Sequence, residues 1–121
     1  MRILLAEDDF FFQNFYSKKL LEKGYEVVLA KDGLEAIEKL TLQKPDIMLL
    51  DLVMPRKDGF EVLTEIEKNT NLQGFPILVF STLGQDTDIE KALKLGATGY
   101  INKTFFDFDN LLSRITSVAN H

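Results

Sequence analysis

The feature that most constrains the fold is a run of four apolar residues, Ile47–Leu50, that ends at an aspartate, Asp51. Four residues are too few for a helix, and such a run is typical of a strand buried on both faces of a parallel sheet. Pro55 and Gly59 then mark a loop. Ligands of open α/β sheets bind beyond the C-terminal ends of the strands, so Asp51 lies where chemistry is expected. Taken alone, an aspartate there is more simply explained as a loop cap.

The rest of the chain alternates short apolar runs with amphipathic stretches. Strands are predicted over residues 2–6, 25–30, 47–50, 77–80 and 100–102, and helices over 10–23, 33–43, 86–95 and 107–120, with one more helix after Gly59. Strands that alternate with helices predict a parallel sheet with helices on both faces. The predicted fold class is therefore α/β, a doubly wound five-stranded parallel sheet in the flavodoxin-like order 2-1-3-4-5. We expect one domain over residues 1–121.

Helical periodicity predicts one apolar face for each helix. The residues expected on or beside these faces are Phe12, Phe15, Tyr16, Leu20 and Leu21, then Ala36, Ile37 and Leu40, then Phe60, Leu63 and Ile66, then Ile89, Ala92 and Leu93, and finally Leu111, Leu112, Ile115 and Val118. Phe10 and Phe11 do not fit the first face. We favour their partial burial against neighbouring loops over a partner-binding patch. Asp32 is a candidate N-cap for the second helix.

Composition excludes several classes of function. The net charge of -5 argues against a nucleic-acid surface. The chain has no cysteine, and its one histidine is the terminal residue, His121, so thiolate chemistry, zinc sites and Ser/His catalysis are not expected. No apolar run approaches the roughly 20 residues that span a bilayer, and the N-terminus does not resemble a signal peptide. We expect a cytoplasmic protein without nucleic-acid or membrane partners.

Polar side chains follow four of the five predicted strands. They are Glu7, Asp8 and Asp9 after the first strand, Asp51 after the third, Ser81 and Thr82 after the fourth, and Lys103 after the fifth. Packed carboxylates repel one another unless a cation is present, and oxygen ligands without His or Cys suit Mg²⁺. A lysine and a hydroxyl can contact phosphoryl oxygens, and a carboxylate can form an aspartyl-phosphate. The predicted site therefore receives a phosphoryl group on one aspartate with Mg²⁺.

With these residues, the chain resembles the receiver domains of bacterial two-component response regulators, such as the single-domain chemotaxis regulators, over essentially its whole length. The matching motifs are Leu5-Ala6-Glu7-Asp8-Asp9, Leu49-Leu50-Asp51-Leu52-Val53-Met54-Pro55, Asp58-Gly59-Phe60, Ser81, and Gly99-Tyr100-Ile101-Asn102-Lys103. One aspartate proves little, but this ordered set at these spacings is highly specific.

The resemblance implies a role for each matching residue. Asp51 is the phosphoacceptor for a sensor histidine kinase or phosphotransfer protein. Asp8 binds Mg²⁺ directly, together with Asp51 and the Val53 carbonyl, and Glu7 binds the ion through water. Lys103 and Ser81 contact the phosphoryl group, and Tyr100 is the aromatic residue that changes rotamer in the switch. Asp9 is either a third acid or a helix N-cap, and Thr82 is a further candidate. The output partner or effector domain would use the face formed by residues 86–95, the last strand and residues 107–120. The domain would phosphorylate and dephosphorylate itself without being an enzyme for other substrates.

Three features depart from the family pattern or affect the lifetime of the aspartyl-phosphate. Thr104 follows Lys103 where the family usually has proline, so the direction in which the Lys103 side chain points is not fixed by the resemblance. The basic pair Arg56-Lys57 is expected to help attract an acidic or phosphorylated partner. Val53 and Leu83, two residues past Asp51 and Ser81, are apolar and predict a long-lived aspartyl-phosphate.

Three alternatives to the switch remain. A phosphohydrolase of the haloacid-dehalogenase type would also use an aspartate nucleophile, but its second aspartate is replaced here by Val53. A nucleotide-binding domain would carry a glycine-rich loop where this chain has acids. A degenerate receiver that only binds partners would not need the complete set of site residues.

Overall fold

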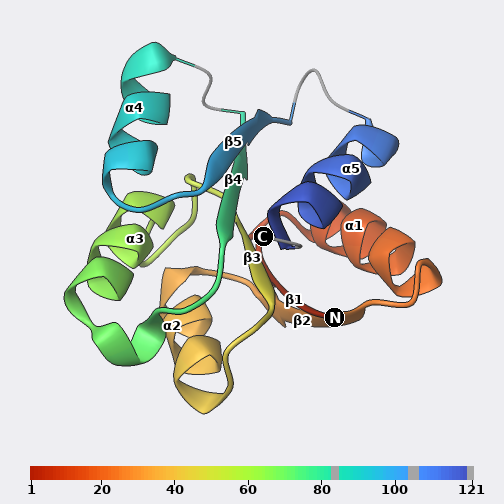
Figure 1. Ribbon diagram of the computed structural model, residues 1–121, viewed down its shortest axis with the longest axis horizontal. Helices are drawn as coiled ribbons and strands as arrows, with labels where there is room; N and C mark the ends of the chain where they lie inside the picture. The colour runs from red at the N-terminus through yellow and green to blue at the C-terminus, as the bar shows by residue number, and fades with distance from the viewer. Residues whose placement is uncertain (83–84, 104–106, 120–121) are drawn as a thin grey trace.

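The computed structural model describes residues 1–82, 85–103 and 107–119, in which strands and helices alternate as predicted (Figure 1). The strands are β1 (Arg2–Ala6), β2 (Glu26–Ala30), β3 (Ile47–Leu50), β4 (Ile77–Ser81) and β5 (Gly99–Asn102). The helices are α1 (Phe10–Glu22), α2 (Gly33–Leu42), α3 (Gly59–Lys68), α4 (Asp86–Lys94) and α5 (Phe108–Ala119), with a 3-10 turn, η1 (Thr70–Leu72). The five strands are parallel in the order β2-β1-β3-β4-β5, which confirms the predicted fold class.

The helices form a layer on each face of the sheet. Figure 1 shows α1 and α5 on one face and α2, α3 and α4 on the other. Strand β3 lies between β1 and β4, and its residues alternate between the two faces. Ile47 and Leu49 pack into the core beneath α1 and α5, whereas Met48 and Leu50 pack into the opposite core. This burial on both faces is why the strand has no polar residue.

Aspartate caps fix the loops that follow the first three strands. Asp9 accepts a hydrogen bond from the Phe12 N–H at the start of α1, and Asp32, as predicted, caps α2. Asp58 caps α3 with a reciprocal capping box. Gly59 follows, and a Cβ atom there would lie 2.5 Å from the Asp51 carbonyl oxygen. Only glycine therefore lets α3 begin so close to the end of β3.

The predicted helix faces are partly wrong. Phe15, Leu21 and Leu93 are exposed, although each was expected to pack inward or beside the inward face. Each directly follows or precedes a buried residue, and neighbours on a helix point about 100° apart, so they turn out of the narrow buried stripe. Phe10 and Phe11 are 75% and 67% exposed, so the favoured burial of these rings is also wrong. The other predicted face residues are buried or partly buried.

Element boundaries differ from prediction by about one residue at several ends, where helices fray and short strands begin. The predictions that concern Leu83, Thr104, Asn120 and His121 lie outside the described residues. Among the helices of the described ranges, none has the length and apolar character needed to cross a membrane.

Candidate functional site

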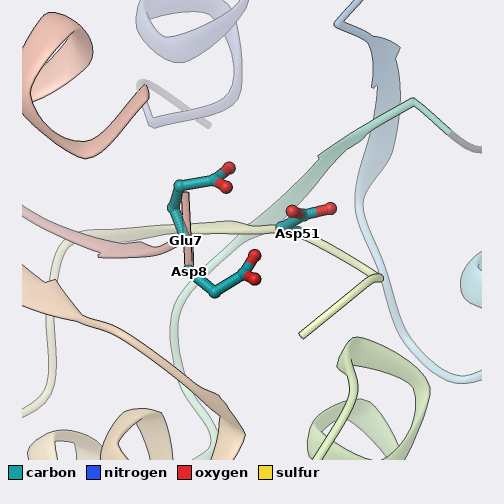
Figure 2. Close-up of side chains that lie close together, drawn as sticks. All are labelled: Glu7, Asp8 and Asp51. Carbon is teal, nitrogen blue, oxygen red and sulfur yellow. The ribbon is translucent and has the colours of Figure 1, made fainter. Parts of the chain in front are cut away.

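Parallel pairing brings the C-terminal ends of the strands to one edge of the sheet, and the predicted acids meet there. Glu7 and Asp8 follow β1, and Asp51 follows β3. Figure 2 shows their three carboxylates together, and one oxygen from each lies within 4.8 Å of the others. Glu7 and Asp51 are buried, whereas Asp8 is exposed. The cluster therefore has a buried floor and one side open to solvent.

The Asp51 carboxylate is held through both of its oxygens. Oδ1 accepts a hydrogen bond from the Val53 N–H at 3.2 Å. Oδ2 accepts from Lys103 Nζ at 3.2 Å. The Asp51 N–H donates to the Ala6 carbonyl at 3.0 Å, which ties the end of β3 to the end of β1. Asp51 is therefore fixed in place beside a cation while remaining 5% exposed.

Glu7 is completely buried and forms an ion pair with Lys103. Its other oxygen accepts from the Asp9 N–H at 3.0 Å. Burial and the nearby Asp51 carboxylate raise the pKa of Glu7 to about 7, although Lys103 and the Asp9 N–H act in the opposite direction. The sequence did not predict this direct Glu7–Lys103 contact. Compared with a glutamate in water, the ionised form of Glu7 is thus disfavoured at this site, even with Lys103 beside it.

Asp8 adds a third carboxylate to the cluster formed with Glu7 and Asp51. Although Asp8 is exposed as a residue, partial desolvation of its carboxyl group raises its pKa, and the Asp51 and Asp9 carboxylates contribute in the same direction. Glu7 and Asp51 pair with the same ammonium group, that of Lys103, and Asp8 adds a third carboxylate, so a divalent cation would relieve their repulsion. The ligand atoms are all hard oxygens, and this chemistry fits Mg²⁺.

The remaining predicted residues lie around this cluster. Ser81 is buried at the end of β4, and its carbonyl accepts from the Lys103 N–H at 3.0 Å. Asp9 caps α1 and is not among the three clustered acids, while Thr82 is exposed just beyond β4. Tyr100 on β5 is half-buried, and its hydroxyl oxygen is buried without a hydrogen-bond partner among the described residues. Burial, followed by the Asp88 and Asp51 charges, raises the pKa of Tyr100.

Two aromatic residues of the site were not recognised from the sequence. Lys103 Nζ lies over the rings of Phe12 and Phe80, at 4.6 and 4.8 Å from their centroids. The helical pattern identified Phe12 only as a core residue. Phe80 directly precedes Ser81, and this neighbouring position was the one sequence signal that could have placed it near the site.

The basic pair after Asp51 has partners within the chain. Arg56 donates through Nε and Nη2 to the buried Asp32 carboxylate, at 2.9 and 2.6 Å. Lys57 Nζ donates to Glu65 at 2.8 Å. Both charges are paired within the chain, and their attraction of an acidic partner stays a prediction.

Comparison with known proteins identifies the class to which this fold and site belong. The pattern of the family described as "Response regulator receiver domain" matches residues 3–116, and the chain belongs to this family. Receiver domains are phosphoacceptor switches of two-component signal transduction.

Individual relatives agree with this assignment. The response regulator RR06 of Streptococcus pneumoniae serotype 2 is 40% identical over 105 residues, which cover 87% of this chain and 47% of that protein. The chemotaxis protein CheY of Halobacterium salinarum is 36% identical over 105 residues, covering 86% of this chain and 85% of that protein. The chain spans about half the length of most of the curated relatives that it matches.

A solved structure matches along nearly the whole chain. It is the receiver domain of a Pseudomonas aeruginosa sensor histidine kinase, with a magnesium ion coordinated in its active-site cleft. The TM-score is 0.90 at 28% identity, covering 99% of this chain and 98% of that one.

Proposed function

We propose that this chain, as one receiver domain over residues 1–121, is a phosphorylation-activated switch that accepts a phosphoryl group on Asp51. The donor would be a phosphohistidine of a sensor histidine kinase or a phosphotransfer protein. The observation that carries the proposal is the fixed Asp51 carboxylate beside Lys103, in a cluster with Glu7 and Asp8. The cytoplasmic location expected from the sequence is part of this proposal.

In the transfer, an Asp51 carboxylate oxygen attacks phosphorus and forms a P–O bond. The P–N bond of the phosphohistidine breaks, and its electron pair stays on the leaving imidazole, which takes up a proton. Lys103 would offset charge on the phosphoryl oxygens from its present position, and the Ser81 hydroxyl would donate a hydrogen bond to one of them. The same pocket would later admit water for autodephosphorylation.

Asp8, Asp51 and the Val53 carbonyl would hold Mg²⁺, and Glu7 would contribute through water. The ion would supply positive charge toward the phosphoryl oxygens. The support for this role is the excess of carboxylates over cations in the cluster, together with the hard oxygen donor set. Among the related structures, the Pseudomonas aeruginosa receiver domain has magnesium in its cleft.

Phosphorylation would change the conformation of the sheet edge at β5. Phosphorylation would draw Ser81 inward and let Tyr100 turn toward the space beside it, repacking the face of α4, β5 and α5 as a two-state element. The buried Tyr100 hydroxyl without a hydrogen-bond partner among the described residues supports a side chain that is not locked in place. Amide shifts on adding beryllofluoride should therefore concentrate on this face and the pocket. Shifts confined to α3 would contradict the proposal.

The decisive experiment is labelling by acetyl phosphate with Mg²⁺, followed by intact-mass spectrometry. The parent should gain one hydroxylamine-labile phosphoryl group. Asp51→Asn should gain none, because the amide is not a nucleophile here. The matched control is Asp32→Asn, which changes another buried carboxylate outside the pocket and should still be labelled. Equal labelling of D51N and the parent would place the acceptor elsewhere and overturn the proposal.

A further inference from the structure

Lys103 is unusual for a lysine, because its side chain is only 4% exposed. Its ammonium group contacts two acids, Glu7 and Asp51, on one side. The rings of Phe12 and Phe80 also lie close to it, at 4.6 and 4.8 Å from Nζ to the ring centroids. These rings come from α1 and β4, whereas Lys103 directly follows β5.

The two rings are themselves held in place by a third aromatic side chain. Phe12 stacks on Tyr16 with 5.7 Å between ring centroids and 10° between planes. Tyr16 in turn meets Phe80 edge to face, at 5.3 Å and 74°. Phe80 and Tyr16 are both buried. Packing against Tyr16 therefore supports the orientation of both rings toward the ammonium group.

An aromatic face attracts a cation through the negative charge of its π-system, within about 6 Å of the centroid. An aliphatic side chain of similar size would fill the same space without this attraction. The attraction also has no fixed acceptor direction, unlike a hydrogen bond to a carbonyl. An ammonium between two ring faces can therefore shift among oxygen partners and keep its contact with the rings.

We propose that Phe12 and Phe80 are positioning residues for Lys103, and that they hold its ammonium group beside Asp51 as the phosphoryl group arrives. The inference rests on the proposed function, in which Lys103 contacts the phosphoryl oxygens. The rings do not touch the reacting atoms and act only through the lysine. They supply a restraint on a side chain whose sequence context, with Thr104 next in the chain, lacks the proline common in the family.

The test replaces Phe12 by phenylalanines with one, two and three ring fluorines, which weaken the negative face while nearly preserving shape. The initial rate of Asp51 labelling by acetyl phosphate at saturating Mg²⁺ should fall stepwise, by about fivefold or more across the series. The matched control is the same series at Phe15, an exposed ring of the same helix with Lys19 at 5.9 Å. The control series should leave the rate unchanged. A flat Phe12 series, or equal slopes at both positions, would overturn the inference.

A second measurement reads the lysine directly. The ε-methylene protons of Lys103 should be shifted upfield by the ring currents of the two faces. Phe12→Leu and Phe80→Leu should each move these resonances toward ordinary lysine values, and Phe15→Leu should not. Unmoved Lys103 resonances in both variants would contradict the geometry. If the parent accepts no phosphoryl group, the proposed function fails; if the parent reacts but the Phe12 series is flat, only this inference fails.

Discussion

Two buried carboxylates that lie just beyond neighbouring strands have pKa values shifted in opposite directions. Glu7 follows β1, and Asp32 lies just beyond β2, next to β1 in the sheet. Each is paired with a basic side chain, Lys103 or Arg56. The pKa of Glu7 is raised to about 7, whereas the pKa of Asp32 is lowered. An ion pair alone therefore does not decide whether a buried acid prefers to be charged.

The difference comes first from the stronger effect of burial on Glu7, and then from how many donors each acid has to itself. Burial raises the pKa of Asp32, but the Glu35 N–H and the Arg56 guanidinium outweigh it and lower the pKa overall. Glu7 shares its one cation with Asp51 and has Asp8 close by. Asp32 is electrostatically satisfied and fastens the loop after β3 to the start of α2. The Glu7 cluster is unsatisfied, because its three carboxylates outnumber the ammonium group that pairs with two of them.

The largest expected effect is the response of the unsatisfied cluster to Mg²⁺. An ion that binds only the folded state adds about 2.7 kcal/mol at a hundredfold excess over Kd. For a domain of this size, we expect Mg²⁺ at that excess to raise the melting temperature by about 10 °C. Asp8→Asn should remove the increase, and Asp32→Asn should retain it. Differential scanning calorimetry gives the readout, and a D8N protein that still responds fully would contradict the Mg²⁺ site.

The next effect is the loss of the satisfied pair. Asp32→Asn removes the charge that accepts two N–H groups of Arg56, and a hydrogen bond to a charged group contributes about 1.5–3 kcal/mol. Because Arg56 is partly exposed, we expect a loss of about 1–3 kcal/mol in the free energy of unfolding at pH 7. Urea denaturation in Mg²⁺-free buffer measures it. The control is Glu38→Gln, an exposed acid on α2, which should change stability by less than about 0.5 kcal/mol. Equal losses in both variants would refute the role of the pair.

The dependence of stability on pH should separate the two acids by sign. A lowered pKa means that Asp32 stabilises the fold above its unfolded value near 3.8, so the difference between parent and D32N should shrink as pH falls below about 4. A raised pKa means that folded Glu7 retains its proton between about 4.5 and 7, so ionisation there opposes folding. Without Mg²⁺, Glu7→Gln should therefore gain stability relative to the parent as pH rises from 5 to 8. Urea titrations at several pH values give the free energy of unfolding of each variant relative to the parent. If this difference changes with pH in the same way for D32N and E7Q, the environments of the two acids do not differ.

The same two regions show which features a sequence can predict. The meeting of Glu7 and Asp51 follows from strand order, because parallel strands present their C-terminal ends at one edge. The cap formed by Asp32 follows from a local preference of side chain and backbone. Both predictions need only the secondary structure and the topology.

The specific ion pairs between side chains that the topology brings near one another could not be predicted. Glu7 and Lys103 are 96 residues apart, and their ion pair depends on rotamers selected by packing. The Arg56–Asp32 pair likewise depends on the path of the loop, where Arg56 has a left-handed φ of 65°. Exposure of Phe15 depends on which side of a helix its neighbours cover, and periodicity alone did not separate it from Tyr16.

The smallest expected effect concerns water access to the reactive acid. Val53 is 51% exposed, and its N–H contacts the Asp51 carboxylate, but its side chain has no atom that could orient a water molecule toward phosphorylated Asp51.

Hydrolysis needs such a water in line with the departing oxygen, and one positioned contact accounts for about 1.4 kcal/mol, or roughly tenfold in rate. We therefore expect Val53→Asn to speed loss of the phosphoryl group by at least about tenfold, while Val53→Leu, which stays apolar, leaves it unchanged. Phosphate release after removal of acetyl phosphate measures both. Leu83→Glu should add to the effect, although Leu83 lies outside the described residues. If V53N decays no faster than V53L, lifetime is set by the Lys103 contact, and fluorination of Phe12 should then alter the decay rate instead.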